Sequence, residues 1–158
     1  MKLFSAIVYV FLSLVMTAQD GPYLLNYNTA DSVILVRSNL NGEIKTDTLK
    51  IPEKVKVQLP GSESHFEAQA QPNKPEEQCV FPEPEKLFAV SDIEGNFNDF
   101  VTILTNNGII DKDLNWTFGK GHLVLNGDLV DRGEFVTQVL WLVRKLETEA
   151  AENGGKVH

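Results

Sequence analysis

The chain has 158 residues, with 14 basic and 22 acidic side chains, a formal net charge of −8 and a single cysteine. Such an acidic surface repels nucleic acid and anionic membranes, so we expect neither as a partner. Cys79 cannot form a disulfide within the chain. Stability is therefore expected from an ordinary hydrophobic core or from bound metal, in a single domain of ordinary size.

Residues 1–19 have the pattern of a secretory signal peptide. Lys2 precedes fourteen uncharged, mostly apolar residues at 3–16, and the small residue Ala18 follows. The apolar stretch is shorter than the roughly 20 residues that a bilayer span needs. We expect a cleaved signal, a secreted or periplasmic protein and no membrane contact after cleavage, with an uncleaved anchor helix as the alternative. The oligomeric state is left open by the sequence.

Residues 20–59 are expected to form a small antiparallel β region. The segments 32–37, 43–49 and 54–59 are strand candidates in which apolar residues or threonine alternate with polar ones, and 39–42 contains the turn signal Asn-Gly. A sheet of about three strands is too small to be stable alone, so it should pack on the C-terminal part of the chain.

The next segment, 60–86, carries five prolines among many Gln, Glu and Ser residues. This composition is typical of an extended linker or surface strap without a packed element of its own. Phe66 and Phe81 would attach such a strap to the surface, and solvent-exposed disorder is the alternative.

From residue 87 the pattern changes to strand, helix, strand, helix. Apolar runs at 87–90 and 122–125 predict buried strands, and Asn96 is placed to cap the first helix. The apolar faces of the two predicted helices are Phe97, Phe100, Val101 and Leu104, and Phe135, Val139, Leu142, Val143 and Leu146. This alternation predicts an α/β unit with a parallel sheet, in which ligands bind at the carboxyl ends of the strands.

Charged side chains follow both predicted strands. Asp92 and Glu94 come after the first strand, and Asp128, Asp131 and Arg132 come after the second. Carboxylates are ligands of hard divalent cations, and two ions about 3.5–4 Å apart can hold a hydroxide for an in-line phosphoryl displacement. A guanidinium can bind phosphate bidentately. Each residue alone would be interpreted as a cap, a turn residue or a surface ion pair, but together they predict a site for metal and phosphate.

The segment 87–158 resembles the first half of a calcineurin-like metallophosphoesterase, in the protein-phosphatase branch that includes the Shewanella-like phosphatases. The family's first motif, usually Asp-x-His-Gly, is matched by 92–95, and its second, Gly-Asp-x-x-Asp-Arg-Gly, by 127–133. The resemblance implies an α/β fold, a β-sandwich flanked by helices. This chain would carry a truncated form of it behind the small antiparallel β region.

The resemblance also implies roles for single residues. Asp92 and Glu94 would bind the first metal ion, and Asp128 would bridge two divalent ions. Asp131 would orient a catalytic histidine, and Arg132 would hold the phosphate. Glu94 replaces the usual histidine, so the ligands are all oxygens, which favours Mn²⁺ or Mg²⁺ over Zn²⁺ or Fe.

The implied function is metal-dependent hydrolysis of phosphate monoesters, with a phosphoprotein slightly favoured as the substrate. A non-catalytic protein that binds a phosphorylated ligand is one alternative, and a nucleotide or phosphodiester hydrolase is another. The family's third motif, Gly-Asn-His followed by Glu or Asp, is missing, and 156–158 resembles the start of the strand that would precede it. We therefore expect the N-terminal part of a longer enzyme, inactive or nearly so by itself. His65, His122 and His158 are interpreted as structural or solvent-facing.

Overall fold

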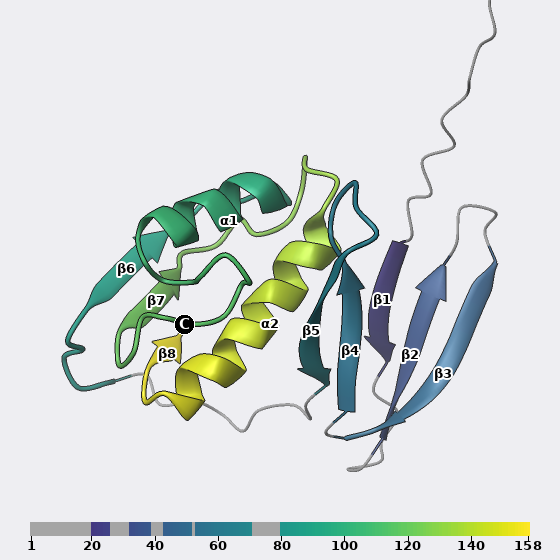
Figure 1. Cartoon of the computed structure of the whole chain (residues 1–158), viewed down its shortest axis with the longest axis horizontal. Helices are drawn as coiled ribbons and strands as arrows, with labels where there is room; N and C mark the ends of the chain where they lie inside the picture. Colours follow the sequence, from purple (N-terminus) through teal and green to yellow (C-terminus); the bar gives the residue numbers. More distant parts are fainter. Residues whose placement is uncertain (1–19, 26–31, 39–42, 52, 71–79) are drawn as a thin grey trace, which may run out of the picture.

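The structure is a computed structural model that describes residues 20–25, 32–38, 43–51, 53–70 and 80–158. The predicted signal peptide and Cys79 lie outside these described residues. Three small sheets and two helices make up this part of the chain (Figure 1). No helix within the described ranges is long and apolar enough to cross a membrane.

The first sheet is antiparallel, with the strand order β1-β2-β3. It consists of β1 (Asp20–Leu25), β2 (Ser32–Ser38) and β3 (Ile44–Lys50), and the second and third of these correspond to the first two predicted strands. β1 was not predicted. The third predicted strand is β4 (Glu53–Gln58), and it pairs with a different partner.

That partner, β5 (His65–Ala70), lies in the segment that was expected to contain no packed element, so this expectation is wrong for residues 65–70. Phe66, Ala68 and Ala70 alternate with polar residues and are buried on one face of the hairpin. The ring of Phe66 stacks on that of Phe97 with 6.1 Å between the centroids. Prolines flank the strand and do not interrupt it, so β pairing is unhindered.

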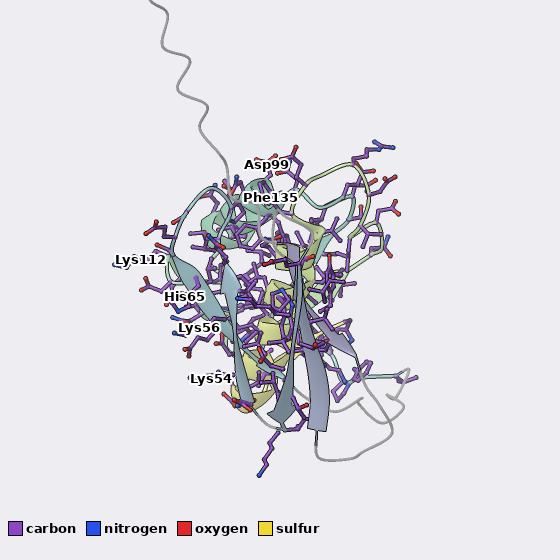
Figure 2. The ribbon with its side chains drawn as sticks, turned by 90° about the vertical axis from the view of Figure 1, so that its right-hand side faces the viewer. Lys54, Lys56, His65, Asp99, Lys112 and Phe135 are labelled. Carbon is purple, nitrogen blue, oxygen red and sulfur yellow. The ribbon has the colours of Figure 1, made fainter. Side chains whose placement is uncertain are left out.

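The outer face of the β4–β5 hairpin is polar. Lys54, Lys56 and His65 are exposed on this face (Figure 2), and Lys54 and His65 also line a cavity that extends to α2. Lys54 forms an ion pair with Glu67 across the strands, with 3.1 Å between Nζ and Oε2. The hairpin therefore has one solvated face and one face that contributes to the core.

The third sheet is parallel, as predicted, with the order β6-β7-β8. It contains β6 (Leu87–Val90), β7 (His122–Leu125) and the short β8 (Lys156–Val157). In the register of β6 and β7, Val90 lies opposite Leu125. β6 and β7 therefore end at the same edge of the sheet.

Helices α1 (Phe97–Asn106) and α2 (Val136–Glu152) connect these strands. The side chain of Asn96 accepts a hydrogen bond from the backbone N–H of Asp99, which confirms the predicted cap. The predicted apolar faces are confirmed as core residues: Phe97, Phe100 and Leu104 of α1 and Val139, Leu142 and Leu146 of α2 are buried, while Val101, Phe135 and Val143 are partly buried against them.

α2 lies between the parallel sheet and the N-terminal strands (Figure 1). One side of the helix contacts β8, and the other contacts β5 and β1. The indole Nε1 of Trp141 donates a buried hydrogen bond of 2.7 Å to the carbonyl oxygen of Pro22. The small β region therefore packs on the α/β part, as its size required.

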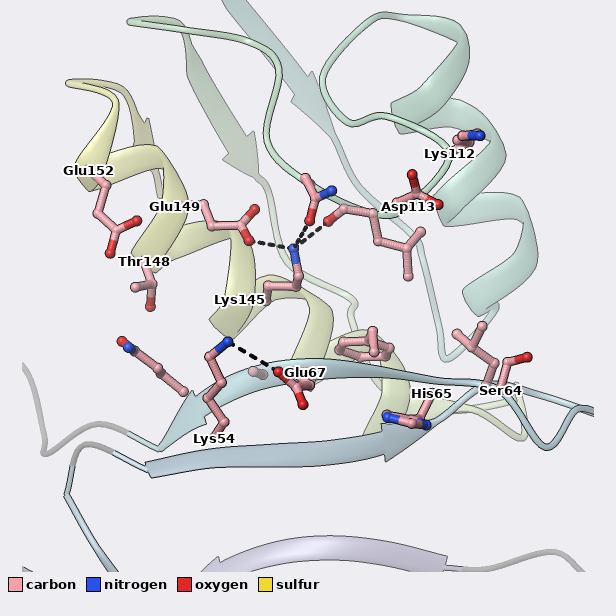
Figure 3. A pocket seen from close by; sticks show the side chains of 16 residues that line it. Lys54, Ser64, His65, Glu67, Lys112, Asp113, Lys145, Thr148, Glu149 and Glu152 are labelled. Atoms are coloured by element: carbon pink, nitrogen blue, oxygen red, sulfur yellow. Dashed lines mark hydrogen bonds and ion pairs between the residues drawn. The ribbon is translucent and has the colours of Figure 1, made fainter.

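A buried lysine fixes α2 to the segment that precedes β7 (Figure 3). Lys145 is only 7% exposed. Its ammonium group donates to the Leu114 carbonyl oxygen at 2.9 Å, to Asn115 Oδ1 at 3.0 Å and to the Glu149 carboxylate. The other oxygen of Glu149 accepts the backbone N–H of Trp116 at 2.8 Å. Every donor of this ammonium group has a partner, which buried charges require.

The same segment makes stability depend on pH. Asp111 accepts the backbone N–H groups of Asn115 at 2.8 Å and of Asp113 at 2.9 Å. These hydrogen bonds, chiefly that from Asn115, lower the pKa of Asp111 below its ordinary value of 3.8. The unfolded chain therefore takes up a proton first as the pH falls, so this contribution to stability is present above about pH 4 and is lost below it.

We expect Asp111→Asn to lose less stability than the wild type between pH 5 and pH 3, a window of about one unit on either side of the ordinary pKa. Urea unfolding at the two pH values measures the difference. Asp113→Asn is the control, because the Asp113 backbone N–H and not its side chain contributes to this arrangement. If the Asp111 variant and the wild type lost the same stability between pH 5 and pH 3, the link between the lowered pKa of Asp111 and stability would be contradicted.

Candidate functional site

Two loops carry the predicted site residues. Residues 91–96 connect β6 to α1, and residues 126–135 connect β7 to α2. They begin side by side, because Val90 and Leu125 are paired and the N–H of Asn126 donates to the Val90 carbonyl oxygen at 2.9 Å. The sequence therefore places both motifs at the carboxyl edge of the parallel sheet.

Backbone hydrogen bonds join the two loops. The N–H of Glu94 donates to the carbonyl oxygen of Asp128 at 2.8 Å, and the N–H of Gly133 donates back to that of Glu94 at 2.7 Å. The N–H of Phe135 donates to the carbonyl oxygen of Gly95 at 3.1 Å. Because these bonds run in both directions, the loops form one connected unit and not two independent surface segments.

The unit depends on close contact between two glycines. A Cβ atom on Gly133 would lie 2.4 Å from the carbonyl carbon of Gly95, and one on Gly95 would lie 2.8 Å from the carbonyl oxygen of Gly133. Real Cβ atoms essentially never come so close to backbone atoms. Glycine at both positions is thus a steric requirement of the loop contact.

The loop backbone is strained at the positions that carry charge. Six residues other than glycine have positive φ in the described part of the chain, and five of them are the predicted site residues: Asp92 at 57°, Glu94 at 47°, Asp128 at 49°, Asp131 at 90° and Arg132 at 51°. Left-handed backbone costs a non-glycine residue roughly 1–3 kcal/mol and tends to occur at functional sites. This concentration is an indication of function that is independent of the motifs.

The charged side chains differ in their partners. Arg132 Nη1 lies 3.2 Å from Glu94 Oε2, and the Arg132 side chain is 76% exposed. An exposed pair of this kind contributes about 0.2–1 kcal/mol, so the guanidinium can leave it at little cost. The Asp92 carboxylate accepts a hydrogen bond from the Ser91 hydroxyl, and Asp131 Oδ1 accepts the N–H of Arg132 at 2.9 Å. Asp128 is exposed.

The fit to metal ions is incomplete in this arrangement. Within the described residues, no three Asp, Glu, His or Cys side chains are grouped so that they could hold a metal ion. Asp92, Glu94 and Asp128 lie on adjoining loops, but Glu94 is paired with Arg132. The two divalent ions expected from the sequence therefore have no preformed site here, and their ligands remain a prediction.

A cavity of about 670 Å³ lies elsewhere (Figure 3). It is bounded by β4, β5, the second half of α2 and residues 112–115, and it includes Lys145 and Glu149 in its wall. None of its lining residues belongs to the two loops. The candidate site is thus an open edge of the sheet and not this hollow.

Sequence reasoning did not identify two features of the site. The Ser91 hydroxyl on Asp92 could have been suspected only from adjacency in the sequence. The pairing of Glu94 with Arg132 depends on left-handed backbone at both residues, which leaves no signal in composition or periodicity.

Comparison with known proteins bears on this edge of the sheet. No model of a known protein family matches the chain. It is 35% identical over 80 residues to Shewanella-like protein phosphatase 2 of Arabidopsis thaliana, and 32% identical over 72 residues to Shewanella-like protein phosphatase 1 of Plasmodium berghei. These alignments cover 51% and 46% of this chain, and 20% of each relative. The chain thus spans about a fifth of the length of these relatives.

The structure is similar to the crystal structure of the cold-active protein-tyrosine phosphatase of a psychrophilic Shewanella species. The TM-score is 0.68 at 32% sequence identity, and the match covers 90% of this chain and 42% of that phosphatase. This similarity confirms the predicted α/β fold class. The resemblance to Shewanella-like phosphatases is also confirmed over part of the chain, whereas membership of the wider calcineurin-like family stays a prediction.

Proposed function

We propose that the protein is a phosphatase that hydrolyses phosphate monoesters, with a phosphoprotein as the favoured substrate. The observation that carries the proposal is the joining of the two motif loops by backbone hydrogen bonds at one edge of the sheet. Similarity to proteins named as protein phosphatases supports it at the level of the family. Substrate and reaction are proposals, since the chain matches only part of those proteins.

In this proposal Arg132 binds the phosphate group. Its guanidinium is largely exposed and held by one weak ion pair, so two of its N–H donors can turn to phosphate oxygens. Helix α1 begins directly after the loop that contains Glu94, and the positive end of a helix favours a nearby anion. Asp131 holds the Arg132 backbone through its N–H.

Metal dependence is a separate part of the proposal. We infer that Asp92, Glu94 and Asp128 bind two divalent ions, with Mn²⁺ favoured because all the ligands are oxygens. Bound ions would supply an activated hydroxide and neutralise charge on the phosphate. Since Arg132 pairs with Glu94, ion binding requires this pair to separate. Stimulation of phosphate release by Mn²⁺, and its loss in a chelator, tests this part; equal rates in both conditions would refute it.

Arg132→Lys is expected to lower kcat/KM for an aryl phosphate by about 10–100-fold in the purified native protein, because lysine keeps the charge but loses bidentate binding. Phosphate release is measured by colorimetry. Arg144→Lys is the matched control, since Arg144 lies on α2 and pairs with Glu147. Equal activity of the Arg132 variant and the wild type would remove the phosphate-binding role.

The class of substrate is tested on the wild type. Faster cleavage of a diester than of a monoester would indicate a diester hydrolase instead of a phosphatase.

One observation favours a second function. The Glu94–Arg132 pair and the absence of a preformed metal group in the described part are also compatible with a protein that binds phosphorylated ligands without cleaving them. Calorimetry with a phosphopeptide, with and without Mn²⁺, separates the two. Tight metal-independent binding without release of phosphate favours the binding protein.

The location of the protein is a further part of the proposal. The apolar run at 3–16 supports export to the periplasm or the cell exterior with removal of residues 1–19. Sequencing of the native amino terminus is expected to begin near residue 20. A mature protein that retains Lys2 would refute cleavage.

A further inference from the structure

The parallel sheet brings together two histidines that are distant in the sequence. His122 is the first residue of β7, at the opposite end of that strand from the loop with Asp128, and His158 directly follows β8. The Nε2 atom of His158 lies 3.0 Å from the Nδ1 atom of His122. Both side chains are partly buried and partly accessible. This pair belongs neither to the motif loops nor to the lining of the cavity.

The distance between these two nitrogens allows both to bind one metal ion. Metal–imidazole bonds are about 2.0–2.1 Å long, so two nitrogens 3.0 Å apart subtend an angle of roughly 90–95° at a shared ion. That angle is the one between neighbouring ligands in tetragonal sites, which Cu²⁺ and Ni²⁺ prefer.

We propose that His122 and His158 form a binding site for a transition-metal ion, with Cu²⁺ preferred over Ni²⁺ and Zn²⁺. The two imidazoles occupy neighbouring positions, and water completes the shell. In the tautomer of each ring that carries its proton on the outer nitrogen, both facing nitrogens present lone pairs. Imidazole is a good ligand for these ions, and Cu²⁺ stands highest in the affinity order of divalent metals.

The surroundings of the pair set its affinity. The edge of the Phe81 ring contacts His158 with 4.6 Å between centroids and lies 6.3 Å from His122, which restricts the motion of both imidazoles. Lys156 places its ammonium group 4.0 Å from the centre of the Phe81 ring. Lys156 also lies opposite His122 in the register of β7 and β8, so its positive charge opposes a cation bound to the pair. Removing it in Lys156→Met is therefore expected to tighten Cu²⁺ binding.

The test is a calorimetric titration of the intact chain with Cu²⁺ in a weakly competing buffer. His122→Asn and His158→Asn are each expected to weaken binding by at least tenfold, since loss even of a residue that only supports a metal ligand typically costs about 10–100-fold. His65→Asn is the matched control, because the chain has three histidines and His65 lies on the outer face of the β4–β5 hairpin (Figure 2). Cys79 is present in every variant, so its contribution cancels.

A second measurement uses the wild type only, so its result does not require any variant to fold. Sub-stoichiometric Cu²⁺ is expected to broaden the imidazole resonances of His122 and His158 in nuclear magnetic resonance spectra before those of His65. Electron paramagnetic resonance should show coupling to two imidazole nitrogens. Equal broadening of all three histidines, or equal affinity of the wild type and both pair variants, would overturn the proposal. The result does not depend on phosphatase activity, because the site shares no residue with the motif loops.

Discussion

Gly133→Ala is expected to lower the free energy of unfolding by about 3 kcal/mol and to separate the two site loops. The added Cβ atom would lie 2.4 Å from the carbonyl carbon of Gly95 and 2.6 Å from the carbonyl oxygen of Glu94. Both obstructing atoms belong to the backbone, so no side-chain rotation makes room. The loops must move apart, and the hydrogen bond from Gly133 to Glu94 is lost with the contact.

Gly127→Ala provides a control in the same loop. Gly127 has φ of 86°, but a Cβ atom there would meet nothing within 4 Å. Alanine at this position adds only the strain of left-handed backbone, about 1–2 kcal/mol. Urea unfolding of the two variants separates the steric cost from the conformational one. A smaller loss for Gly133→Ala than for Gly127→Ala would contradict the contact between the loops.

The second large effect is expected for Lys145→Met, which should destabilise the fold by about 3 kcal/mol. Methionine fills a similar volume but leaves the Glu149 carboxylate, the Leu114 carbonyl and Asn115 Oδ1 without their shared donor. Breaking a buried ion pair typically costs about 3–5 kcal/mol, and the lower end applies because the Glu149 side chain is 25% exposed. Thermal or urea unfolding measures the loss.

Two further variants test the cause. Adding Glu149→Gln to Lys145→Met removes the unpaired charge, and the amide oxygen can still accept the N–H of Trp116, so part of the stability should return. Lys54→Met breaks the exposed pair with Glu67, which water screens, so this variant should lose much less stability than Lys145→Met. Equal losses for Lys54→Met and Lys145→Met would show that burial of the ion pair is not what matters.

The parts of the fold that could be predicted are those determined by local periodicity. Phe100 and Leu104 repeat at helical spacing, and residues 122–125 form an apolar run next to turn residues, so α1 and β7 were predictable. Neighbouring parallel strands end at one edge of their sheet, so the sequence alone was enough to predict that Asp92 and Asp128 lie on adjoining loops.

The remaining features depend on contacts between segments that are distant in the sequence. β5 was missed because Ala68 and Ala70 are small, which made its apolar face inconspicuous among prolines and polar residues. The pairing of His122 with His158 depends on the register of β7 and β8, which neither strand encodes alone. The link between Glu94 and Arg132 depends on unusual backbone angles that no propensity scale predicts.

The backbone of the two loops also bears on how this chain tolerates substitution. At positions 92, 94, 128, 131 and 132, glycine would adopt the observed angles without strain. A sequence optimised for thermal resistance alone would favour glycine there. The chain carries four acids and an arginine at these positions instead. It is therefore less stable than a chain with glycine there, but it has charged groups at this edge of the sheet. Glycine substitutions at these five positions should therefore raise thermal stability and abolish the function of this edge of the sheet.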